Sequence, residues 1–553
     1  MEASYDLVAW QWDEDNDPKN FPVWITDVVH DQPMPPLVLY AWLYHHGMSQ
    51  TYAHEVLSLP ECKGWLWRVV DGWSRISLFY PKPEEIEERA RVFRERVAPL
   101  IEGHEKLWPQ AISEMLELYR PFKEIEIEKV SDIELKRVFE DVWLTHKRQW
   151  EVHMYWMFFY YNNFILFSEM CDELLGFDEN DPTFKKLMSG FDNMLFRVNK
   201  EIWRLGNSAR ELGLADLFLS TEDDEEVMRK LEQSDAGRKW LGEYREFLNE
   251  HGWRCERLFR FDMPTWIEKP SLGIPDIRKG IAKGGAFILD EERERLERER
   301  KKTEEEVLAK VPAEKREWFG KLMRVAQAAG EFSETHDYYL DFQSHACVRK
   351  VTWEIGKRYA QAGTIEEPSD VYFLLPDEVE YCLVPRYDVS LRRQVARRKE
   401  EWRRNIANVP AMFVGNPALI PDMCRKSGGL RVTAPSPVVK PELKADLYGT
   451  ASAPGVVEGV ARVIMSQDQL REVQPGEILV APATAAPWTP IFGIISAVVT
   501  DGGGALSHAV IVAREYGIPC IAGCIEGTSK IKTGMKLKVD GDNGVVYILG
   551  EAA

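Results

Sequence analysis

The sequence lacks most of the features that mark secreted, membrane-spanning or disulfide-stabilised proteins. Its 553 residues include only eight cysteines, which are scattered and form no Cys-x-x-Cys pair. The two that lie nearest each other, Cys520 and Cys524, fall in a predicted strand and turn, so we expect eight reduced thiols and no metal site. No run of about twenty apolar residues occurs, and Met1 to Trp10 carries no signal-peptide pattern. These absences predict a soluble, cytoplasmic protein.

Basic residues are too few to balance the acidic ones. The sequence contains 70 lysines and arginines against 90 aspartates and glutamates, which gives a formal net charge of −20 at pH 7. A domain that binds nucleic acid needs a concentrated basic surface. We therefore expect no nucleic-acid partner, and the absence of an apolar span predicts no membrane partner.

What the sequence does contain divides into three parts, as expected for a multidomain chain of this length. Residues 1–414 show helical periodicity and predict a mainly α-helical region. Residues 415–444 contain five prolines and the pair Gly428-Gly429, a composition typical of a linker or an extended segment. Residues 445–553 predict a small α/β domain, which the linker would allow to swivel.

Aromatic residues are abundant in the helical region. The sequence has 19 tryptophans, and a buried indole N–H needs a partner, so this number favours aromatic-lined surfaces or pockets. Trp150, Tyr155 and Phe158 fall in the stretch from Ile133 to about Met170, which predicts one long helix or two, and their rings would suit a planar ligand. An aromatic stripe at helical spacing is also typical of a packed core, which stays the alternative.

The most informative segment is Thr500-Asp501-Gly502-Gly503-Gly504-Ala505-Leu506-Ser507-His508. The residues from Ile494 to Thr500 predict a short buried strand that leads into the three glycines. Ser507 is a favourable N-cap, so His508 takes the first helical position, and the helix is expected to end at Gly517. A second strand after Gly517 completes a predicted β-α-β unit.

This arrangement suits a histidine that carries a phosphoryl group. Unpaired N–H groups and the positive end of the helix dipole favour phosphate at a helix N-terminus, and the same field keeps an imidazole neutral and nucleophilic. His508 and Ser507 are therefore predicted catalytic residues. The phosphoryl-binding candidates are Thr500, Gly502, Gly503, Gly504 and, six residues further on, Arg514. The alternative is a structural histidine that caps a helix after a glycine-rich turn.

The motif resembles the mobile phosphohistidine domain of phosphoenolpyruvate-utilising enzymes, which include phosphoenolpyruvate synthase, pyruvate phosphate dikinase and rifampin phosphotransferase. The family pattern Thr-x-x-Gly-Gly-x-x-Ser-His-x-x-Ile-x-x-Arg-Glu continues into Gly517-Ile518-Pro519, with Val510 where alanine is usual. Similar segments extend upstream to Gly449 to Gly455 and downstream to Gly544-Val545-Val546. By this resemblance, His508 is phosphorylated and then discharged to an acceptor.

The N-terminal part is similar to the large subunit of phenylphosphate synthase and its relatives, which phosphorylate phenols and hydroxyphenyl ketones. The similarity rests on Asp17 to Trp24, His45-His46-Gly47-Met48 and Pro60 to Trp65. In that family a separate ATP-grasp subunit binds ATP and Mg²⁺. The sequence here shows neither a glycine-rich ATP-grasp loop nor a Gly-x-x-x-x-Gly-Lys-Ser/Thr motif, and it leaves no room for a phosphoenolpyruvate-binding barrel. We therefore expect the ATP site on a partner polypeptide.

The acceptor site is expected in the helical region. A phenol has a pKa of about 10 and needs a base or a cation beside its oxygen at neutral pH. By the resemblance, one helix near residue 340 lines the acceptor pocket, and its predicted catalytic residues are His336, Asp337 and Arg349. The predicted substrate contacts are Trp150, Tyr155, Phe158, His345 and Arg254. For each of these a structural role is the alternative, and His251 and the His45-His46 pair are further candidates.

Together these features predict the phosphotransferase subunit of a split dikinase. ATP on the partner would phosphorylate His508 with release of AMP and phosphate, as the resemblance implies, and His508 would transfer the phosphoryl group to a phenolic hydroxyl. Two alternatives stay open: a non-aromatic acceptor such as pyruvate or an antibiotic hydroxyl, and a non-enzymatic phosphocarrier. The sequence names neither the phenol nor the partner.

Overall fold

The computed structural model describes residues 21, 23–26, 33–70, 72–283, 289–383, 390–408, 413–416, 419–433 and 441–551. The chain forms two compact units whose segments alternate along the sequence. The first unit consists of Met1–Phe159, Arg257–Pro264 and Tyr339–Ser427, and the second of Tyr160–Glu256, Thr265–Tyr338 and Gly428–Ala553.

Two long helices dominate the first unit: α3 (Ile86–Glu124) and α4 (Asp132–Leu175), the last part of which belongs to the second unit. Acidic residues occupy the first turn of each helix, where the helix dipole favours them. The buried face of α4 is aromatic, because Phe139, Trp150 and Phe158 are each at most 1% exposed. The stretch from Ile133 to about Met170, predicted as one long helix or two, is one continuous helix. The other helices of this unit are α1 (Pro36–Ala41), η3 (Trp42–Gly47), α2 (Met48–Leu57), η4 (Pro83–Glu85), η5 (Ile127–Lys129), α13 (Gln343–Ala362), η8 (Pro368–Phe373), α14 (Pro376–Cys382), α15 (Arg392–Ala407) and α16 (Ile420–Lys426).

A four-stranded antiparallel sheet with the order β2-β3-β1-β4 completes the first unit. In it β1 (Val23–Thr26) pairs with both β3 (Trp73–Phe79) and β4 (Phe413–Gly415), and β2 (Gly64–Val70) pairs with β3. The sequence did not predict this sheet, because its strands are short and β4 is far from the others along the chain.

The segment 415–444, predicted as a linker or an extended stretch, is helical in part. It contains α16 and, in the second unit, α17 (Gly428–Thr433). Met423 and Cys424 of α16 are buried, and Ser427 accepts a hydrogen bond from Trp65 Nε1 at 3.1 Å. Composition alone misses α16 because a proline in the first turn of a helix is well tolerated. Residues 417–418 and 434–440 of the predicted linker lie outside the described residues.

The helical part of the second unit begins with clear capping signals. Asn193, Asp223 and Ser234 each accept a hydrogen bond from a backbone N–H at the start of a helix, which satisfies donors that the helix itself leaves unpaired. The helices are α5 (Pro182–Leu187), α6 (Met194–Glu211), α7 (Ala215–Ser220), α8 (Asp224–Leu231), α9 (Asp235–His251), η6 (Pro270–Gly273), α10 (Ile274–Lys283), α11 (Leu289–Lys310) and α12 (Ala313–His336). A π-helical segment, η7 (Asp337–Phe342), follows α12.

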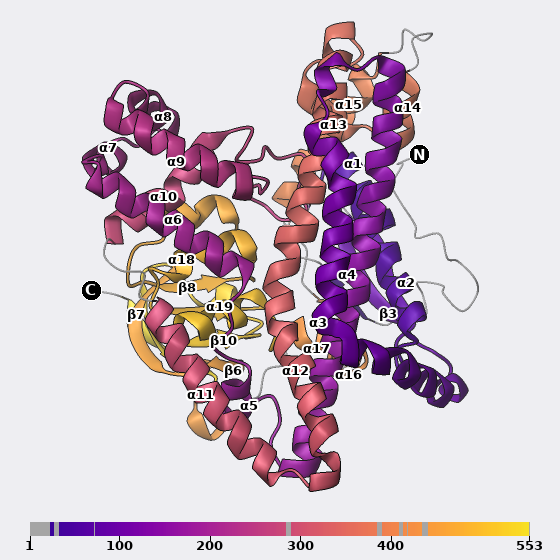
Figure 1. The fold of residues 1–553 in the computed structure, drawn as a ribbon, viewed down its shortest axis with the longest axis vertical. Helices are drawn as coiled ribbons and strands as arrows, with labels where there is room; N and C mark the ends of the chain where they lie inside the picture. Colours follow the sequence, from indigo (N-terminus) through magenta and orange to yellow (C-terminus); the bar gives the residue numbers. More distant parts are fainter. Residues whose placement is uncertain are drawn as a thin grey trace. The chain divides into compact units, whose positions relative to one another are not determined.

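The rest of the second unit is the small α/β domain that the sequence predicted, built on an eight-stranded sheet with the order β5-β12-β11-β7-β8-β9-β10-β6. Its central strands β7 (Val456–Val463), β8 (Ile478–Ala481), β9 (Ala497–Thr500) and β10 (Cys520–Ala522) run parallel, and the flanking strands pair antiparallel. The remaining elements are η10 (Pro441–Leu443), β5 (Leu447–Tyr448), β6 (Thr450–Ala453), η11 (Gln467–Glu472), η12 (Ala486–Trp488), α18 (Thr489–Phe492), α19 (His508–Tyr516), α20 (Gly527–Lys530), β11 (Met535–Asp540) and β12 (Val545–Glu551). Figure 1 shows α18 and α19 beside strands β8 and β10, drawn in yellow.

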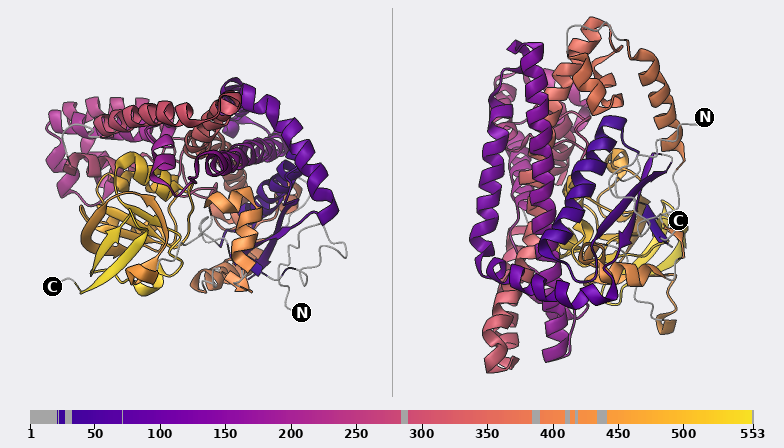
Figure 2. Two further views of the ribbon diagram at one scale, coloured as in Figure 1. Left: turned by 90° about the horizontal axis from the view of Figure 1, so that it is seen from below. Right: turned by 90° about the vertical axis from the view of Figure 1, so that its right-hand side faces the viewer.

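Within the second unit the α/β domain packs against the helices. Its helix α19 contacts α11 and α12, and α18 contacts α6. The left view of Figure 2 shows the yellow domain beside the magenta and pink helices of this unit. The carboxyl ends of the parallel strands β8 and β9 therefore lie close to these helices. In parallel sheets, ligands bind at the carboxyl ends of the strands.

Across the described residues, no helix has both the length and the apolarity required to cross a lipid bilayer. Each of the eight cysteines is a free thiol, and seven are buried.

Candidate active site

The turn after β9 places His508 at the first residue of α19. Ser507 holds the N-cap position with extended backbone, as predicted, but its hydroxyl donates to the Gly504 carbonyl at 2.9 Å instead of accepting from the helix. Gly503 has a φ of +112°, and a Cβ there would lie 2.8 Å from Ser507 Oγ, so the turn requires glycine at this position. Helix α19 ends at the left-handed Gly517, as the sequence predicted.

The turn also presents free backbone amides. The N–H groups from Gly503 to Leu506 donate to no acceptor within the part of the chain that the structure describes. The Thr500 hydroxyl is likewise buried without a hydrogen-bond partner there. Successive free amides ahead of a helix N-terminus form an anion-binding concavity. The glycine turn can therefore receive the oxygens of a phosphoryl group.

Two threonines hold the ring of His508. Thr484 Oγ1 lies 2.8 Å from Nδ1, and Thr489 Oγ1 lies 3.0 Å from Nε2. The Thr489 hydroxyl donates its only hydrogen to the Ala486 carbonyl at 2.6 Å, so it accepts from His508. This hydrogen-bond pattern assigns the ring proton to Nε2 and leaves Nδ1 to accept from Thr484.

His508 is neutral in this environment. Burial lowers the pKa of His508 to about 3, and its side chain is 10% exposed. Glu334 of α12 places Oε2 3.7 Å from Nε2, a separation that would suit an ion pair. However, burial, reinforced by the nearby Asp337, raises the pKa of Glu334 well above its ordinary value. The imidazole is therefore neutral, and the raised pKa of Glu334 favours the protonated form of the carboxyl beside it; burial, more than the helix field, keeps His508 uncharged.

Arg514 supports the glycine turn. Its Nη2 donates to the Ala505 carbonyl at 3.1 Å, while its Nε is buried without a hydrogen-bond partner among the described residues. Burial lowers the pKa of Arg514. The guanidinium thus fixes the loop that presents His508.

Three further contacts join the α/β domain to the helices of the second unit. The Gly190 N–H donates to the Glu515 carboxylate at 3.0 and 3.2 Å. Asn199 Nδ2 donates to Tyr516 Oη at 3.1 Å, and Ser333 Oγ donates to the Leu506 carbonyl at 3.1 Å. Together with the approach of Glu334 to Nε2, these contacts hold α19 and the turn before it against α12 and its neighbouring helices.

Of the predicted acceptor-site residues, His336, Asp337 and Arg254 lie in the second unit. His336 Nδ1 donates to the Phe332 carbonyl at 2.8 Å, and its Nε2 lies 3.2 Å from Asp337 Oδ1. Asp337 follows Glu334 by three residues. The buried Arg254 guanidinium instead packs over the Trp266 ring, 4.7 Å from its centroid, and burial lowers the pKa of Arg254.

In the first unit Trp150 and His345 meet in a cluster of aromatic rings and buried histidines. The His345 ring lies 6.1 Å from Trp150 and 5.0 Å from His146, measured between centroids. His146 and His45 are joined by a hydrogen bond of 2.7 Å between their Nδ1 atoms. Burial lowers the pKa of His45 to about 3, that of His345 to about 4, and that of His146 well below its ordinary value. All three rings are therefore neutral.

Arg349, Tyr155 and Phe158 lie elsewhere in the first unit. Arg349 Nη1 donates to the Asp262 carbonyl at 2.9 Å and to Tyr372 Oη at 3.1 Å. Phe158 packs on His54, with 4.1 Å between ring centroids, and burial raises the pKa of the half-buried Tyr155. The structure therefore does not gather the predicted aromatic contacts Trp150, Tyr155 and Phe158 around one point.

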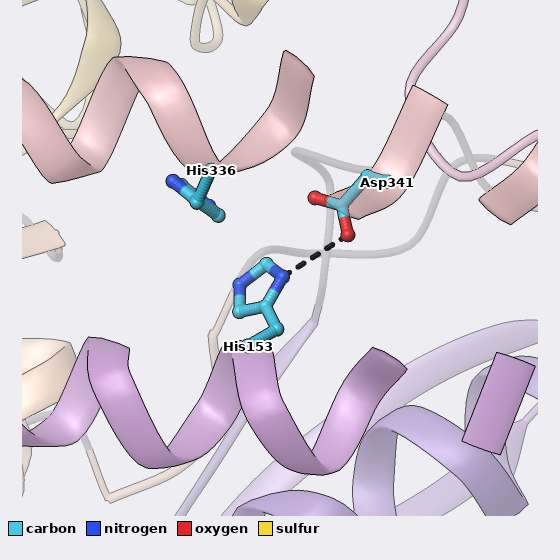
Figure 3. A group of neighbouring side chains, drawn as sticks. All are labelled: His153, His336 and Asp341. Carbon is cyan, nitrogen blue, oxygen red and sulfur yellow. Dashed lines mark hydrogen bonds and ion pairs between the residues drawn. The ribbon is translucent and has the colours of Figure 1, made fainter. Parts of the chain in front are cut away.

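Sequence reasoning missed two polar residues of this cluster, His153 and Gln149. Both bind Asp341 Oδ1: Gln149 Nε2 at 2.5 Å and His153 Nδ1 at 3.1 Å, as Figure 3 shows for His153. Asp341 is fully buried. The signal was present in the spacing of His146, Gln149 and His153, which recur at helical intervals on one face of α4.

Comparison with known proteins supports the resemblance found in the sequence. Residues 473–544 match the PEP-utilising enzyme mobile domain, and residues 152–334 match the rifampicin phosphotransferase fourth domain. The chain is 27% identical to the uncharacterized phosphotransferase YvkC of Bacillus subtilis strain 168, over 69% of this chain and 45% of that protein. It is 28% identical to a rifampicin phosphotransferase of Streptomyces sviceus, over 62% of this chain and 40% of that protein. Alignment with the rifampicin phosphotransferase of Bacillus subtilis covers 60% of this chain and 37% of the relative at 25% identity. The chain thus spans less than half the length of these curated relatives.

Proposed function

We propose that the protein is a phosphotransferase whose His508 carries the phosphoryl group between a donor and an acceptor. The observation that supports this most directly is a neutral imidazole at a helix N-terminus, next to the free amides from Gly503 to Leu506. A neutral imidazole is a nucleophile, and the amides suit the phosphoryl oxygens. The matched mobile domain contains this whole arrangement.

The reacting nitrogen in this proposal is Nε2. It lies at the tip of the ring and faces Thr489 and Glu334, whereas Nδ1 faces Thr484 of the loop after β8. For attack on phosphorus, Nε2 must release its proton, and Nδ1 must carry the ring proton instead. Thr484 can accept from a protonated Nδ1, because a hydroxyl is both donor and acceptor.

We further propose a phenolic acceptor and a donor on a separate subunit. The first unit holds a set of features that suit a hydroxyaryl ring: neutral histidines, stacked aromatic rings, and buried polar atoms that lack hydrogen-bond partners among the described residues. These atoms are His146 Nε2, Gln149 Oε1 and Trp150 Nε1. A phenol offers a hydroxyl to such groups and a flat face to the rings. The donor would be Mg²⁺-ATP on an ATP-grasp partner, yielding AMP and phosphate, and the α/β domain would swivel between donor and acceptor.

The test follows the phosphoryl group on the protein itself. Wild-type protein and a His508→Gln variant are incubated with a panel of aryl phosphates, and phosphopeptides are mapped under alkaline conditions that preserve phosphohistidine. We expect one phosphoryl group on His508 of the wild type and none in the variant. A His54→Gln variant is the matched control, because burial lowers the pKa of His54 to about 4 and this histidine is also neutral. Phosphorylation elsewhere, with His508 dispensable, would contradict the proposal.

The donor half-reaction has its own test. In extracts of the source cells, ATP labelled at the β-position should label His508, while ATP labelled at the γ-position should release labelled phosphate. Label from the γ-position on His508 would contradict the dikinase scheme and leave the carrier role intact.

A second acceptor class has specific support from the relatives that are named rifampicin phosphotransferase. In that case the acceptor would be a hydroxyl of a large antibiotic. Chasing phosphorylated protein with phenols, simple alcohols and a rifamycin separates the two classes, because only the true class should discharge His508 with saturation.

A further inference from the structure

We propose that Glu334 takes the proton from the acceptor hydroxyl as the phosphoryl group leaves His508. The inference rests on the proposed phosphotransferase function and adds a catalytic residue to it. Wherever the rest of the acceptor is held, its oxygen must approach the phosphorus on Nε2, and Glu334 is the carboxyl found there.

The position of Glu334 carries the argument. Its side chain projects from α12 and is 2% exposed, and its Oε2 lies 3.7 Å from His508 Nε2. That oxygen is buried and has no hydrogen-bond partner within the described residues. A buried carboxyl oxygen without a partner is rare, because its desolvation is not repaid by a hydrogen bond. An acceptor hydroxyl seated between Glu334 and the phosphorus would supply the missing hydrogen bond.

The hydroxyls of Thr489 and of Ser333, the residue before Glu334, cannot serve as the base. Thr489 is an alcohol whose hydrogen is already given to the Ala486 carbonyl. Ser333 donates to the Leu506 carbonyl and also contacts Tyr161 Oη at 2.8 Å. A carboxylate is the stronger base of these groups, and burial and the adjacent Asp337 increase its basicity further by raising the pKa of Glu334.

The step balances without any other reactant. The acceptor oxygen bonds to phosphorus as the Nε2–P bond breaks, and the electron pair of that bond stays on Nε2. The hydroxyl proton passes to the Glu334 carboxylate. His508, protonated at Nδ1, leaves as neutral imidazole, and Glu334 ends as a carboxylic acid. The products, neutral His508 and protonated Glu334, are the forms that burial favours at these two positions.

A purely structural Glu334 would behave differently. If it only packed α12 against α19, its replacement would slow transfer to every acceptor by the same factor. A base that removes the acceptor proton matters most for weakly acidic hydroxyls and little for acidic ones, which lose their proton without help.

The test measures single-turnover discharge of protein that has been phosphorylated on His508 with phosphoramidate. The chase uses phenols of graded acidity, from phenol to nitrophenols, with wild type, Glu334→Gln and, as a matched control, Glu331→Gln one turn earlier on α12. We expect Glu334→Gln to slow discharge to phenol by about 10²- to 10⁴-fold. The loss should shrink to less than about tenfold for the nitrophenols, and Glu331→Gln should follow the wild type.

Formate rescue provides a second measurement in a second variant, so misfolding of Glu334→Gln alone does not decide the outcome. Added formate should restore discharge to phenol in Glu334→Ala and leave the nitrophenol rate unchanged. An equal loss of discharge rate for all phenols in Glu334→Gln would overturn the role of Glu334. So would an unchanged discharge rate in Glu334→Gln together with no effect of formate on Glu334→Ala. Failure of the wild type to form or discharge phosphorylated His508 would instead overturn the proposed function.

Discussion

Thr489 accepts a hydrogen bond from His508 Nε2 at 3.0 Å while giving its own hydrogen to the Ala486 carbonyl. This one contact fixes the tautomer of the unphosphorylated ring. In the tautomer that attacks phosphorus, Nε2 carries a lone pair in place of its hydrogen. That lone pair would repel the Thr489 oxygen, whose own hydrogen is already donated to Ala486, so the resting site disfavours this tautomer. The resting site therefore holds His508 in the tautomer that does not attack phosphorus until Thr489 or the ring moves.

Replacing Thr489 should change that tautomer. In Thr489→Val the Nε2–H loses its acceptor, at a cost of about 1–3 kcal/mol, which corresponds to a shift of roughly 5- to 150-fold toward the Nδ1–H tautomer. Nitrogen-15 spectra of histidine-labelled protein report the tautomer directly. The sequence has only 11 histidines, so the spectrum of His508→Gln identifies the signal. Thr489→Ser keeps the hydroxyl and should retain the wild-type tautomer; an unchanged Thr489→Val spectrum would refute the assignment.

Glu334 should make stability fall with rising pH. Its pKa is raised in the folded state, so above the ordinary carboxyl value the folded protein still holds a proton that the unfolded chain has lost. The free energy of unfolding then decreases by about 1.4 kcal/mol for each pH unit until the folded-state pKa is passed. Glu334→Gln removes this dependence. We expect urea denaturation to show the variant gaining on the wild type between pH 5 and pH 8, and parallel curves would contradict the raised pKa.

The same group predicts the pH profile of phosphoryl discharge. Glu334 accepts a proton only when ionised, and the groups facing it are His508 of α19, Asp337 of η7 and Tyr161 of α4. Discharge to phenol should therefore rise with pH through a range above the ordinary carboxyl value. In Glu334→Gln this rise should disappear. Picric acid, a trinitrophenol that stays ionised throughout this pH range, serves as the control acceptor and should show no such rise in either protein.

Glu515 should control how firmly the α/β domain is seated on its helices. Burial raises the pKa of Glu515 to about 7, and its carboxylate receives the Gly190 N–H. Glu515→Ala leaves that amide without its acceptor, at about 1–3 kcal/mol. Hydrogen exchange of Gly190 and of α19 should accelerate by roughly 5- to 150-fold at pH 8. Glu526→Ala, an exposed site on the same domain, should not change it, and equal effects of both variants would argue against the contact.

Asp341 should stabilise the first unit through its two hydrogen-bond donors. Asp341→Ala leaves Gln149 Nε2 and His153 Nδ1 without their buried acceptor, so we expect a loss of about 2–5 kcal/mol in the free energy of unfolding. Asp341→Asn keeps an acceptor oxygen and should lose less than half as much. Urea denaturation measures both variants, and equal losses would show that the charge of Asp341 matters more than its hydrogen bonds.

The carrier half of the site could be predicted because its determinants are local. The strand before the glycines, the cap position of Ser507 and the stop at Gly517 all lie within about twenty residues, where backbone preferences decide the fold. Even there the sequence could not show that the Ser507 hydroxyl turns back to Gly504, or that burial keeps His508 neutral, because both depend on packing.

The partners of His508 could not be predicted because they arrive from distant parts of the chain. Thr484 comes from the loop after β8 and Thr489 from the first residue of α18, while Glu334 comes from α12, more than 170 residues before the histidine. The sequence pointed to His336 at the end of α12 and to Asp337 at the start of η7, while the carboxyl that reaches the ring lies three residues before Asp337. Helical spacing predicts which residues share one face of a helix, but it does not predict which element of the chain packs against that face.

The order of segments in the second unit has a practical consequence for gene fragments. Glu334 and Asn199 are encoded before residue 427, whereas Tyr516 and His508 are encoded after it. A truncation near that point separates the two halves of one folded body and leaves each with an uncovered contact surface. Co-expressing the two fragments as separate polypeptides is therefore a complementation assay, in which recovery of phosphoryl transfer reports reassembly across α19.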